Sequence, residues 1–289
     1  MTSLSVMGVG RVGGEVAFLA AATGLADELN LMDTFTPLLD AQVLDLLHTG
    51  LDISITRDPA AIKESDLFVF AAGTPRNPNI KTRADLLDAN LPVAGLCARY
   101  LDGFSGIAIA VTNPMDANTF YLQQKSGLDR SRIIGFGGQL DSTRFRGFLR
   151  ERGYPAEEAW VLGEHGEHQV PVFSRLPFPV PGPEQDEILA QMRQASMPVI
   201  RGKGGTVFGP AYGIASLIRA IVRDERVVLP CSCVLEGEYG EAGVALGVPA
   251  RIGKDGISEI VAWDLEEKEQ ERFREAAASV RGLVRKAQG

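Results

Sequence analysis

The chain carries near its start the sequence LSVMGVGRVG, at residues 4–13, which joins an apolar run to a helix-like stretch. The run over 4–9 is typical of a buried strand, and the apolar spacing over 12–23 is typical of a helix. Gly8, Gly10 and Gly13 therefore form G-x-G-x-x-G in a turn from strand to helix. Glycines there allow a tight turn and a close approach of the backbone to a pyrophosphate, which binds the amides of the helix N-terminus.

An acidic residue completes this pattern. Asp33 follows Gly13 by 20 residues and ends the next strand-like run, at 29–32. A carboxylate in that place binds the ribose hydroxyls of an adenosine, and it repels a 2′-phosphate. The sequence therefore predicts a dinucleotide site that prefers NAD to NADP.

Strand-like runs alternate with helix-like stretches through the first half of the chain. Such crossovers require a parallel sheet with helices on both faces. We therefore predict an α/β protein whose N-terminal part is a Rossmann doubly wound parallel sheet. The expected strands are 4–9, 29–32, 67–71 and 107–111, and the expected helices are 12–23, 40–48, 84–100 and 115–125.

The pattern changes after about residue 136. A strand-like run at 159–162, a proline-rich connector at 177–183 and an amphipathic helix over 264–286 follow without strict alternation. We expect two domains, a dinucleotide-binding domain over 1–138 and an α+β substrate and catalytic domain over 139–289. The run 247–254 resembles a P-loop, but its glycines are one residue too far apart and Asp255 replaces the required Ser or Thr. We predict a surface turn there.

Composition excludes several classes of partner. The 289 residues include 37 acidic and 29 basic side chains, a net charge of −8, which has the wrong sign for a nucleic-acid binder. No apolar run approaches the ~20 residues of a membrane span. The three cysteines are typical of reduced thiols and not of a disulfide framework. Because the glycine turn begins at Gly8, we expect no signal peptide and a cytoplasmic protein without nucleic-acid or membrane partners.

The chain has only three histidines, His48, His165 and His168. His165 lies between glycines in GEHGE, just after a strand-like run, a setting suited to an exposed catalytic imidazole. His48 lies in a helical pattern. His165 and His168 lack an evident third ligand nearby, so we predict no metal site.

A colinear series of motifs resembles the lactate/malate dehydrogenase family, and it covers most of the chain. The segments 203–211 and 237–254, with GEYG at 237–240, most resemble the archaeal-type malate dehydrogenases, the lactate-dehydrogenase-like branch of that family. The motifs are Gly8–Gly13, Asp33, AGTPR at 72–76, Arg83, TNP at 112–114, LDSTR at 140–144, GEHGE at 163–167 and GGT at 204–206.

The resemblance implies hydride transfer between NAD(H) and a 2-hydroxy or 2-oxo acid, (S)-malate and oxaloacetate in this branch. It assigns proton exchange to His165 and orientation of its imidazolium to Asp141. Substrate binding falls to Arg76, Arg83, Asn113, Arg144 and Thr206. Cofactor binding falls to Gly8, Gly10, Arg11, Val12, Gly13, Asp33, Ala72, Gly73, Asn90, Val111 and Asn113.

The choice of substrate depends on a loop register. Counting forward from Gly73 places Arg76 where malate dehydrogenases bind the second carboxylate, whereas counting back from Arg83 places Asn77 there, because this loop is one residue longer than the usual pattern. A lactate or other 2-hydroxyacid dehydrogenase is therefore the alternative, and a non-catalytic NAD-binding protein is a remote one. The YxxxK pair of short-chain dehydrogenases also occurs, at Tyr121 and Lys125, but the glycine spacing disagrees with that class. The family further implies a homodimer or homotetramer.

Overall fold

The computed structural model describes residues 1–74, 80 and 82–288. The first half alternates strands and helices, as the sequence predicts. Its elements are β1 (Ser3–Met7), α1 (Arg11–Ala22), β2 (Glu28–Met32), α2 (Thr36–His48), β3 (Ser54–Thr56), β4 (Leu67–Phe70), α3 (Arg83–Tyr100), β5 (Ile107–Ala110), α4 (Met115–Ser126) and β6 (Ile133–Gly135).

These six strands are parallel and lie in the order β3-β2-β1-β4-β5-β6. Leu4 of β1 is in register with Leu29 of β2 on one side and with Leu67 of β4 on the other. This is the strand order of doubly wound dinucleotide-binding sheets, in which ligands bind at the carboxyl ends of the strands where the order reverses. The predicted Rossmann fold is confirmed.

The second half is α+β, also as predicted. Its elements are α5 (Gly138–Glu151), β7 (Val161–Gly163), β8 (Gln169–Pro171), α6 (Gly182–Gln194), α7 (Met197–Lys203), α8 (Phe208–Val222), β9 (Val227–Glu236), β10 (Ala242–Gly253), β11 (Gly256–Ile260) and α9 (Glu267–Gln288). Strands β9 and β10 form a long antiparallel hairpin.

One pairing, Gly135 of β6 with Ser232 of β9, connects the two halves of the sheet. Through this pairing, the described residues form one mixed sheet of eleven strands. The boundary expected at residues 138/139 stays a prediction, because the sheet itself continues past it.

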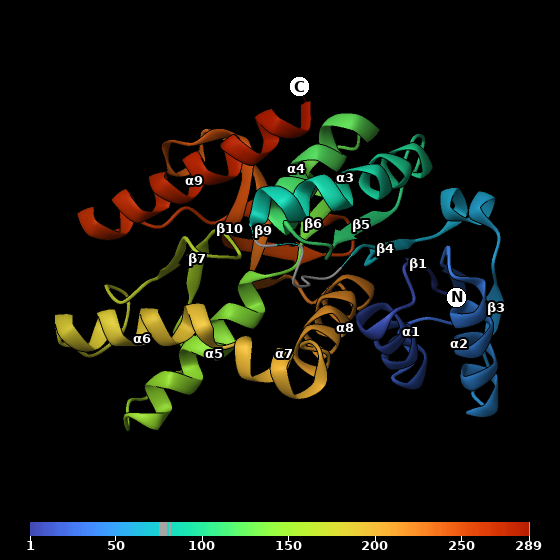
Figure 1. Cartoon of the computed structure of the whole chain (residues 1–289), viewed down its shortest axis with the longest axis horizontal. Coiled ribbons are helices and arrows are strands. Elements are labelled where there is room, and N and C mark those ends of the chain that lie inside the picture. Colours follow the sequence, from blue (N-terminus) through green and yellow to red (C-terminus); the bar gives the residue numbers. More distant parts are fainter. Residues whose placement is uncertain (75–79, 81, 289) are drawn as a thin grey trace.

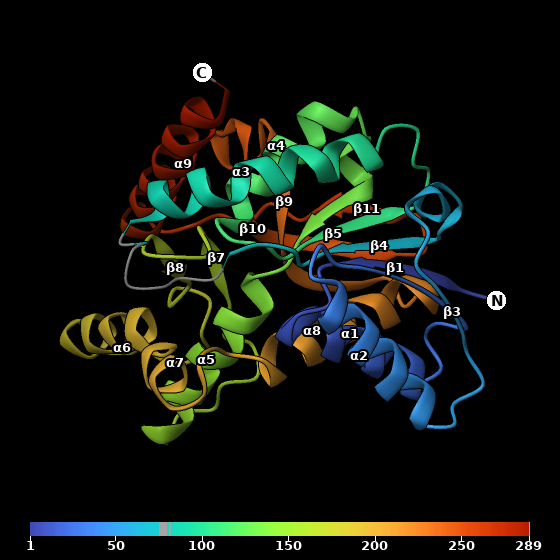
Figure 2. The same cartoon turned by 45° about the vertical axis from the view of Figure 1, so that its right-hand side comes forward.

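Helices cover both faces of the sheet (Figures 1 and 2). Helices α3, α4 and α9 lie on one face, and α1, α2 and α8 lie side by side on the other. Helix α8 comes from the second half of the chain, yet it packs against α1 of the first half. This contact brings the segment that precedes α8 close to the glycine turn that precedes α1.

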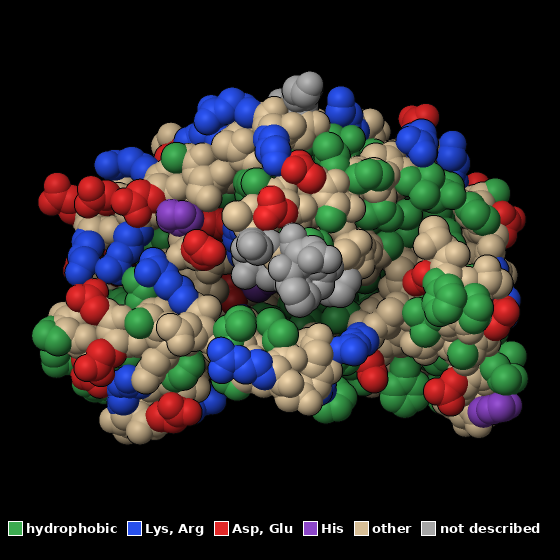
Figure 3. Space-filling model, in the orientation of Figure 1, with side chains coloured by type: hydrophobic (Ala, Val, Ile, Leu, Met, Phe, Trp, Pro, Cys, Tyr) green, Lys and Arg blue, Asp and Glu red, His purple; other side chains and the backbone are tan. Residues whose placement is uncertain are grey.

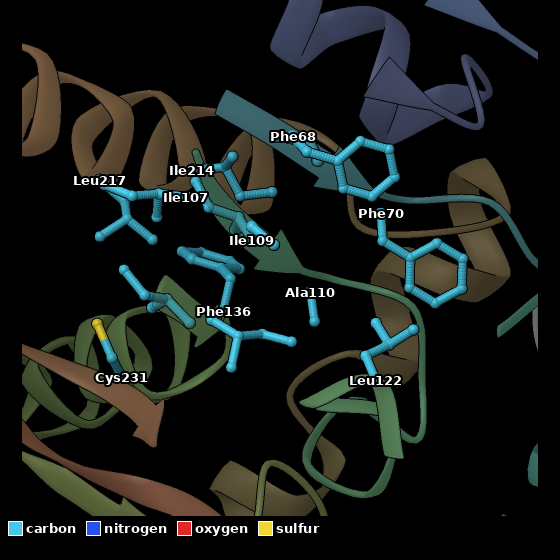
Figure 4. Packing of buried hydrophobic residues seen from close by; sticks show 14 of the residues in the cluster. Phe68, Phe70, Ile107, Ile109, Ala110, Leu122, Phe136, Ile214, Leu217 and Cys231 are labelled. Carbon is cyan, nitrogen blue, oxygen red and sulfur yellow. The ribbon is translucent and has the colours of Figure 1, made fainter. Parts of the chain in front are cut away.

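The core is continuous between the halves. Phe136 lies among side chains of β5, α8 and β9, represented by Ile109, Ile214 and Cys231 (Figure 4). Gly213 is required on α8 because a Cβ there would lie 2.5 Å from Cζ of the Phe136 ring. Close packing of this kind tolerates added volume poorly.

One expectation about the second half is wrong. Residues 247–253 are not a surface turn, because they form the buried end of β10. Gly247 is in register with Gly163 of β7, and a Cβ on Gly247 would lie 2.9 Å from the Gly163 carbonyl oxygen. The glycine thus serves a close approach of two strands.

Along the described ranges, no single helix is both long and apolar enough to cross a bilayer. A pair bent by 114°, residues 182–203 and 208–222, meets the length and composition criteria only when its two members are taken together.

Two glycines of the turn provide a matched test of the packing between β1 and α1. A Cβ on Gly13 would lie 1.9 Å from the Gly8 carbonyl oxygen, whereas a Cβ on Gly10 would meet no atom of the described chain within 4 Å. Gly13→Ala is therefore expected to destabilise the protein by at least about 1–3 kcal/mol.

Thermal unfolding measures the difference. A loss of this size lowers the melting temperature by at least about 3 °C. Gly10→Ala should have the same melting temperature as the wild type. Equal melting temperatures for the two variants would contradict the close approach of α1 to β1.

Candidate active site

The glycine turn is shaped by its neighbours at the carboxyl ends of β1 and β4. Gly8 has φ +94°, in the left-handed region, and a Cβ there would lie 2.3 Å from the Ala72 backbone. Gly13 lets α1 sit directly on the turn. Gly8 and Gly13 are thus required by the fold itself, and Gly10 leaves an open surface.

The N-terminus of α1 fits the pyrophosphate of a dinucleotide. Gly10 is the N-cap, and within the described chain no side chain caps the helix and no acidic residue lies in its first turn. The first amides, including that of Val12, are therefore free for an anion, and the helix dipole attracts negative charge. The open space beside Gly10 gives such a group room to approach.

Asp33 lies just after β2 and is bound to the same turn. Its Oδ2 accepts a hydrogen bond from the Val9 amide at 3.1 Å, and its Oδ1 accepts one from the Phe35 amide at 2.9 Å. The carboxylate is half-buried at the end of the strand. The structure thus places Asp33 beside the glycine turn, where the sequence predicts ribose recognition.

The side chain of Arg11 is bound to the second half of the chain, and its part in cofactor binding stays a prediction. Its Nη1 donates to the carbonyl oxygen of Lys203 at 2.8 Å, at the end of α7. A Cβ on Gly204 would lie 2.3 Å from this same Nη1. Arg11 therefore connects the glycine turn to the segment leading to Thr206, which is half-buried just before α8.

A buried amide connects the loops after β4 and β5. Asn90 accepts a hydrogen bond from the Thr74 amide at 2.7 Å and donates to the Asn113 carbonyl oxygen at 2.8 Å. Ala72, Gly73 and Val111 lie on the same two loops. Asn90 is 1% exposed and its side-chain amide connects these two loops, while its part in cofactor binding stays a prediction.

His165 meets its predicted carboxylate. His165 Nδ1 lies 2.6 Å from Oδ2 of Asp141, a residue of α5 that is 1% exposed. Arg144, one turn further along α5, donates from Nη1 to the other oxygen, Asp141 Oδ1, at 3.2 Å. Gly137 leaves room for the imidazole, since a Cβ there would lie 2.6 Å from His165 Cγ.

Arg83 reaches the same segment from the start of α3. Its Nη2 donates to the His165 carbonyl oxygen at 2.7 Å, and its Nε lies 3.1 Å from Glu164 Oε1. The structure thus brings together four of the predicted site residues, His165, Asp141, Arg144 and Arg83. Arg76 and its alternative Asn77 lie outside the described residues.

Sequence reasoning missed a second carboxylate behind the histidine. Asp116 Oδ2 accepts a hydrogen bond from the His165 amide at 2.7 Å, and its Oδ1 accepts one from Ser232 Oγ at 2.7 Å. Asp116 directly follows the TNPM run, and an acidic residue in the first turn of a helix is common because it suits the helix dipole. Its contacts join residues far apart in sequence, so no local signal reveals them.

The carboxylates control the charge of the imidazole. Burial alone lowers the pKa of His165, but Asp141, through its charge and its hydrogen bond, and then Asp116 raise it further than burial lowers it. The net result is a raised pKa, which favours the protonated ring. Burial raises the pKa of Asp116 itself to about 6, although its hydrogen bond from Ser232 and the charge of His165 oppose the rise.

The site therefore combines a proton carrier with two arginines at the edge of a dinucleotide fold. A half-buried imidazole with a raised pKa can give or take a proton near neutral pH. Arg83 and Arg144 supply positive charge for an anion beside it. Within the described ranges, no group of three or more His, Cys, Asp or Glu residues is placed to hold a metal ion.

Asp116→Asn tests the electrostatic part of this arrangement. Asn can still accept from the His165 amide, but it removes a negative charge, so the pKa of the His165 ring should fall. An NMR titration of the histidines measures this, with the distant, exposed His48 as the internal control. An unchanged His165 titration would remove Asp116 from the electrostatics of the site.

The same variant should change the dependence of stability on pH. A carboxyl pKa raised from 3.8 to about 6 on folding costs about 3 kcal/mol once the group is ionised. This cost is absent below pH 3.8 and grows as the pH rises through about 6. Asp116→Asn should therefore be more stable than the wild type in denaturant at pH 8, and this gain should shrink as the pH falls toward 4.

Comparison with known proteins agrees with this geometry. Residues 2–135 match the NAD binding domain of lactate/malate dehydrogenase, and residues 138–288 match its alpha/beta C-terminal domain. A malate dehydrogenase of Natronomonas pharaonis is 38% identical, with 96% of each chain covered. An L-lactate dehydrogenase of a Geobacillus species is 33% identical, with 98% of this chain and 96% of the relative covered.

A solved structure, malate dehydrogenase from Archaeoglobus fulgidus in complex with NADH, superposes with a TM-score of 0.91 at 32% identity. It covers the whole of both chains. These matches extend from the glycine turn through the His165 segment to α9, so they include every described residue of the site. The chain belongs to the lactate/malate dehydrogenase family and is an NAD-binding enzyme of that family.

Proposed function

We propose that the protein is an NAD-dependent malate dehydrogenase, which interconverts (S)-malate and oxaloacetate. The observation that carries the chemistry is the 2.6 Å contact between His165 Nδ1 and Asp141, made beside Arg83 and Arg144. The choice of malate is supported by the relatives, because malate dehydrogenases of haloarchaea are 37–38% identical, compared with 33% for L-lactate dehydrogenases.

The contact with Asp141 selects the nitrogen of His165 that exchanges the proton. A carboxylate only accepts hydrogen bonds, so Nδ1 carries a hydrogen and donates it to Asp141. Nε2 then holds the exchangeable proton. In reduction, Nε2 gives its proton to the C2 oxygen as a hydride adds to C2, and in oxidation it takes the proton back.

The two arginines act on opposite parts of the substrate. Arg144 is fixed by Asp141 at Nη1, which leaves other donors of its planar guanidinium for the C1 carboxylate. Arg83 stabilises the negative charge that develops on the C2 oxygen when hydride adds. Both side chains are 19% exposed, so these charges act in a site that holds little water.

The cofactor fits the open N-terminus of α1, with Gly10 and Val12 at the pyrophosphate and Asp33 at the ribose hydroxyls. When bound, NAD supplies the hydride acceptor or donor. Asn90 connects the two loops that carry Gly73 and Asn113. We place these loops between the pyrophosphate site at α1 and His165.

Substrate selection by Arg76 gives a direct test. If Arg76 binds the distal carboxylate of oxaloacetate, Arg76→Gln leaves that charge without a partner at a cost of about 2–5 kcal/mol. The kcat/KM for oxaloacetate should then fall by about 10²–10³. Pyruvate carries a methyl group in place of the distal carboxylate, so the kcat/KM of Arg76→Gln for pyruvate should fall only slightly or rise.

NADH oxidation with oxaloacetate, pyruvate and branched 2-oxo acids measures these ratios. Arg99→Gln, at an exposed arginine of α3, is the matched control and should change none of them. If Arg76→Gln slows all substrates equally or none, Asn77→Ala is the variant that should change the ratio. Wild-type turnover of pyruvate in preference to oxaloacetate would make the protein a lactate-type or broader 2-hydroxyacid dehydrogenase.

We also propose that two copies of the chain associate through α1, α2 and α8. Large apolar side chains remain exposed on these neighbouring helices, among them Leu44 and Leu47 on α2 and Phe208 and Tyr212 on α8, at 54–71% exposure. Figure 3 shows hydrophobic side chains over this lower right region. Exposed apolar patches of this kind are typical of association surfaces, and a second copy of the chain presents the same patch in return.

Light scattering on a sizing column tests this association. The wild type should have a mass of two or four chains, and a variant with both Leu44→Lys and Tyr212→Lys should dissociate toward one chain. Both positions are exposed, so the variant should keep its helical circular dichroism. A wild-type mass of one chain at micromolar concentration would overturn the proposal.

A further inference from the structure

We propose that Glu164 is a positioning residue, which holds the guanidinium of Arg83 in its working place beside His165. This inference rests on the role of Arg83 in 2-oxo acid reduction and not on the preference for malate. It begins from the contact of Arg83 Nε with Glu164 Oε1, at 3.1 Å.

The Arg83 guanidinium is fixed at two of its nitrogen atoms by one short segment. Nε faces Glu164, and Nη2 donates to the carbonyl oxygen of His165 at 2.7 Å. Gly166 is required next to them, since a Cβ there would lie 2.0 Å from Nη2. The proton carrier and the cation that stabilises developing charge are therefore both fixed to residues 164–166.

This attachment leaves one nitrogen for substrate. Within the part of the chain that the structure describes, the side-chain hydrogen bond of Arg83 is made by Nη2, and its ion pair with Glu164 is made by Nε. A guanidinium is planar, so fixing Nε and Nη2 also fixes the direction of the Nη1 hydrogens. Glu164 thereby controls where the remaining donor is presented.

Burial explains why the charge of Glu164 depends on Arg83. Glu164 is 2% exposed, and it lies close enough to a second buried carboxylate, Asp116, for the two charges to repel each other. Its Oε2 accepts only a long contact from the His168 amide, at 3.4 Å, and its Oε1 makes no aligned hydrogen bond within the described chain. An ionised carboxylate in such surroundings requires a nearby cation, and Arg83 is the cation in contact with it.

The ion pair with Glu164 also keeps the Arg83 guanidinium in one position. A cation that is already in position needs no rearrangement when charge develops on the substrate, and this preorganisation is what makes such a cation effective. The buried Nε of Arg83 lacks an aligned hydrogen bond as well, so charge attraction, and not a directional bond, holds the pair. Removal of the charge on Glu164 should therefore loosen Arg83 even where the shape of the side chain is kept.

A double-mutant cycle of Glu164→Gln and Arg83→Gln tests the proposal. Activity is measured with whichever 2-oxo acid the wild type reduces. Glu164→Gln should lower kcat by about 10- to 100-fold, as expected when a catalytic cation is displaced, with the Kd for NADH unchanged. In the Arg83→Gln background, Glu164→Gln should produce no further loss. Glu167→Gln, at the exposed glutamate of the same segment, is the matched control and should keep wild-type kcat.

Thermal unfolding gives a second readout that does not depend on turnover. Arg83→Gln leaves Glu164 buried without a cation and should lower the melting temperature, and adding Glu164→Gln should restore part of it. The proposal is overturned if Glu164→Gln slows the Arg83→Gln enzyme by the same factor as the wild type, or if the double variant melts no higher than Arg83→Gln. If no 2-oxo acid is reduced, the proposed function fails, while the melting temperatures still decide whether the two charges depend on each other.

Discussion

Three carboxylates buried around one imidazole impose the constraint on which the site depends. Asp141, Asp116 and Glu164 are each no more than 2% exposed, and together they face His165 and the arginines Arg83 and Arg144. Buried charges of one sign repel each other and lose their hydration, so each needs a donor or a cation in a fixed place. The fold supplies these partners from α3, α4, α5, β9 and the loop after β7.

This requirement explains why the residues of the site come from both halves of the chain. Asp116 stands at the start of α4, and Ser232 reaches it from β9 at the junction of the sheet. Arg11 extends from the glycine turn to the end of α7. Burial of Asp116 at this junction raises the pKa of its carboxyl to about 6.

The parts of the structure that follow local rules could be predicted from the sequence. The glycine turn, Asp33 and the alternation of the first half depend on spacing along the chain. The positions of β1, α1 and β2 and the parallel direction of the strands could therefore be predicted. The glycine-flanked setting of His165 indicates a catalytic imidazole, whereas the roles of Asp141, Arg83 and Arg144 follow from the resemblance, and the structure brings the four residues together. The sequence assigns no role to Asp116 or Glu164, because their partners are distant along the chain. The partners of Asp116 lie 49 and 116 positions away, and Arg83 lies 81 positions from Glu164. The prediction of a surface turn at 247–253 is wrong because Gly247 serves the close approach of β10 to β7, which the spacing of glycines alone does not distinguish from a turn.

The pairing of Gly135 with Ser232 has a mechanical consequence. A hinge motion between the two halves would have to shift Ser232 relative to Gly135. Ser232, however, also donates a hydrogen bond to Asp116, and Asp116 accepts one from the backbone amide of His165. Any rigid-body swing about this junction would pull the imidazole away from its supports. Domain closure by a hinge at this point is therefore incompatible with the hydrogen bonds that support His165.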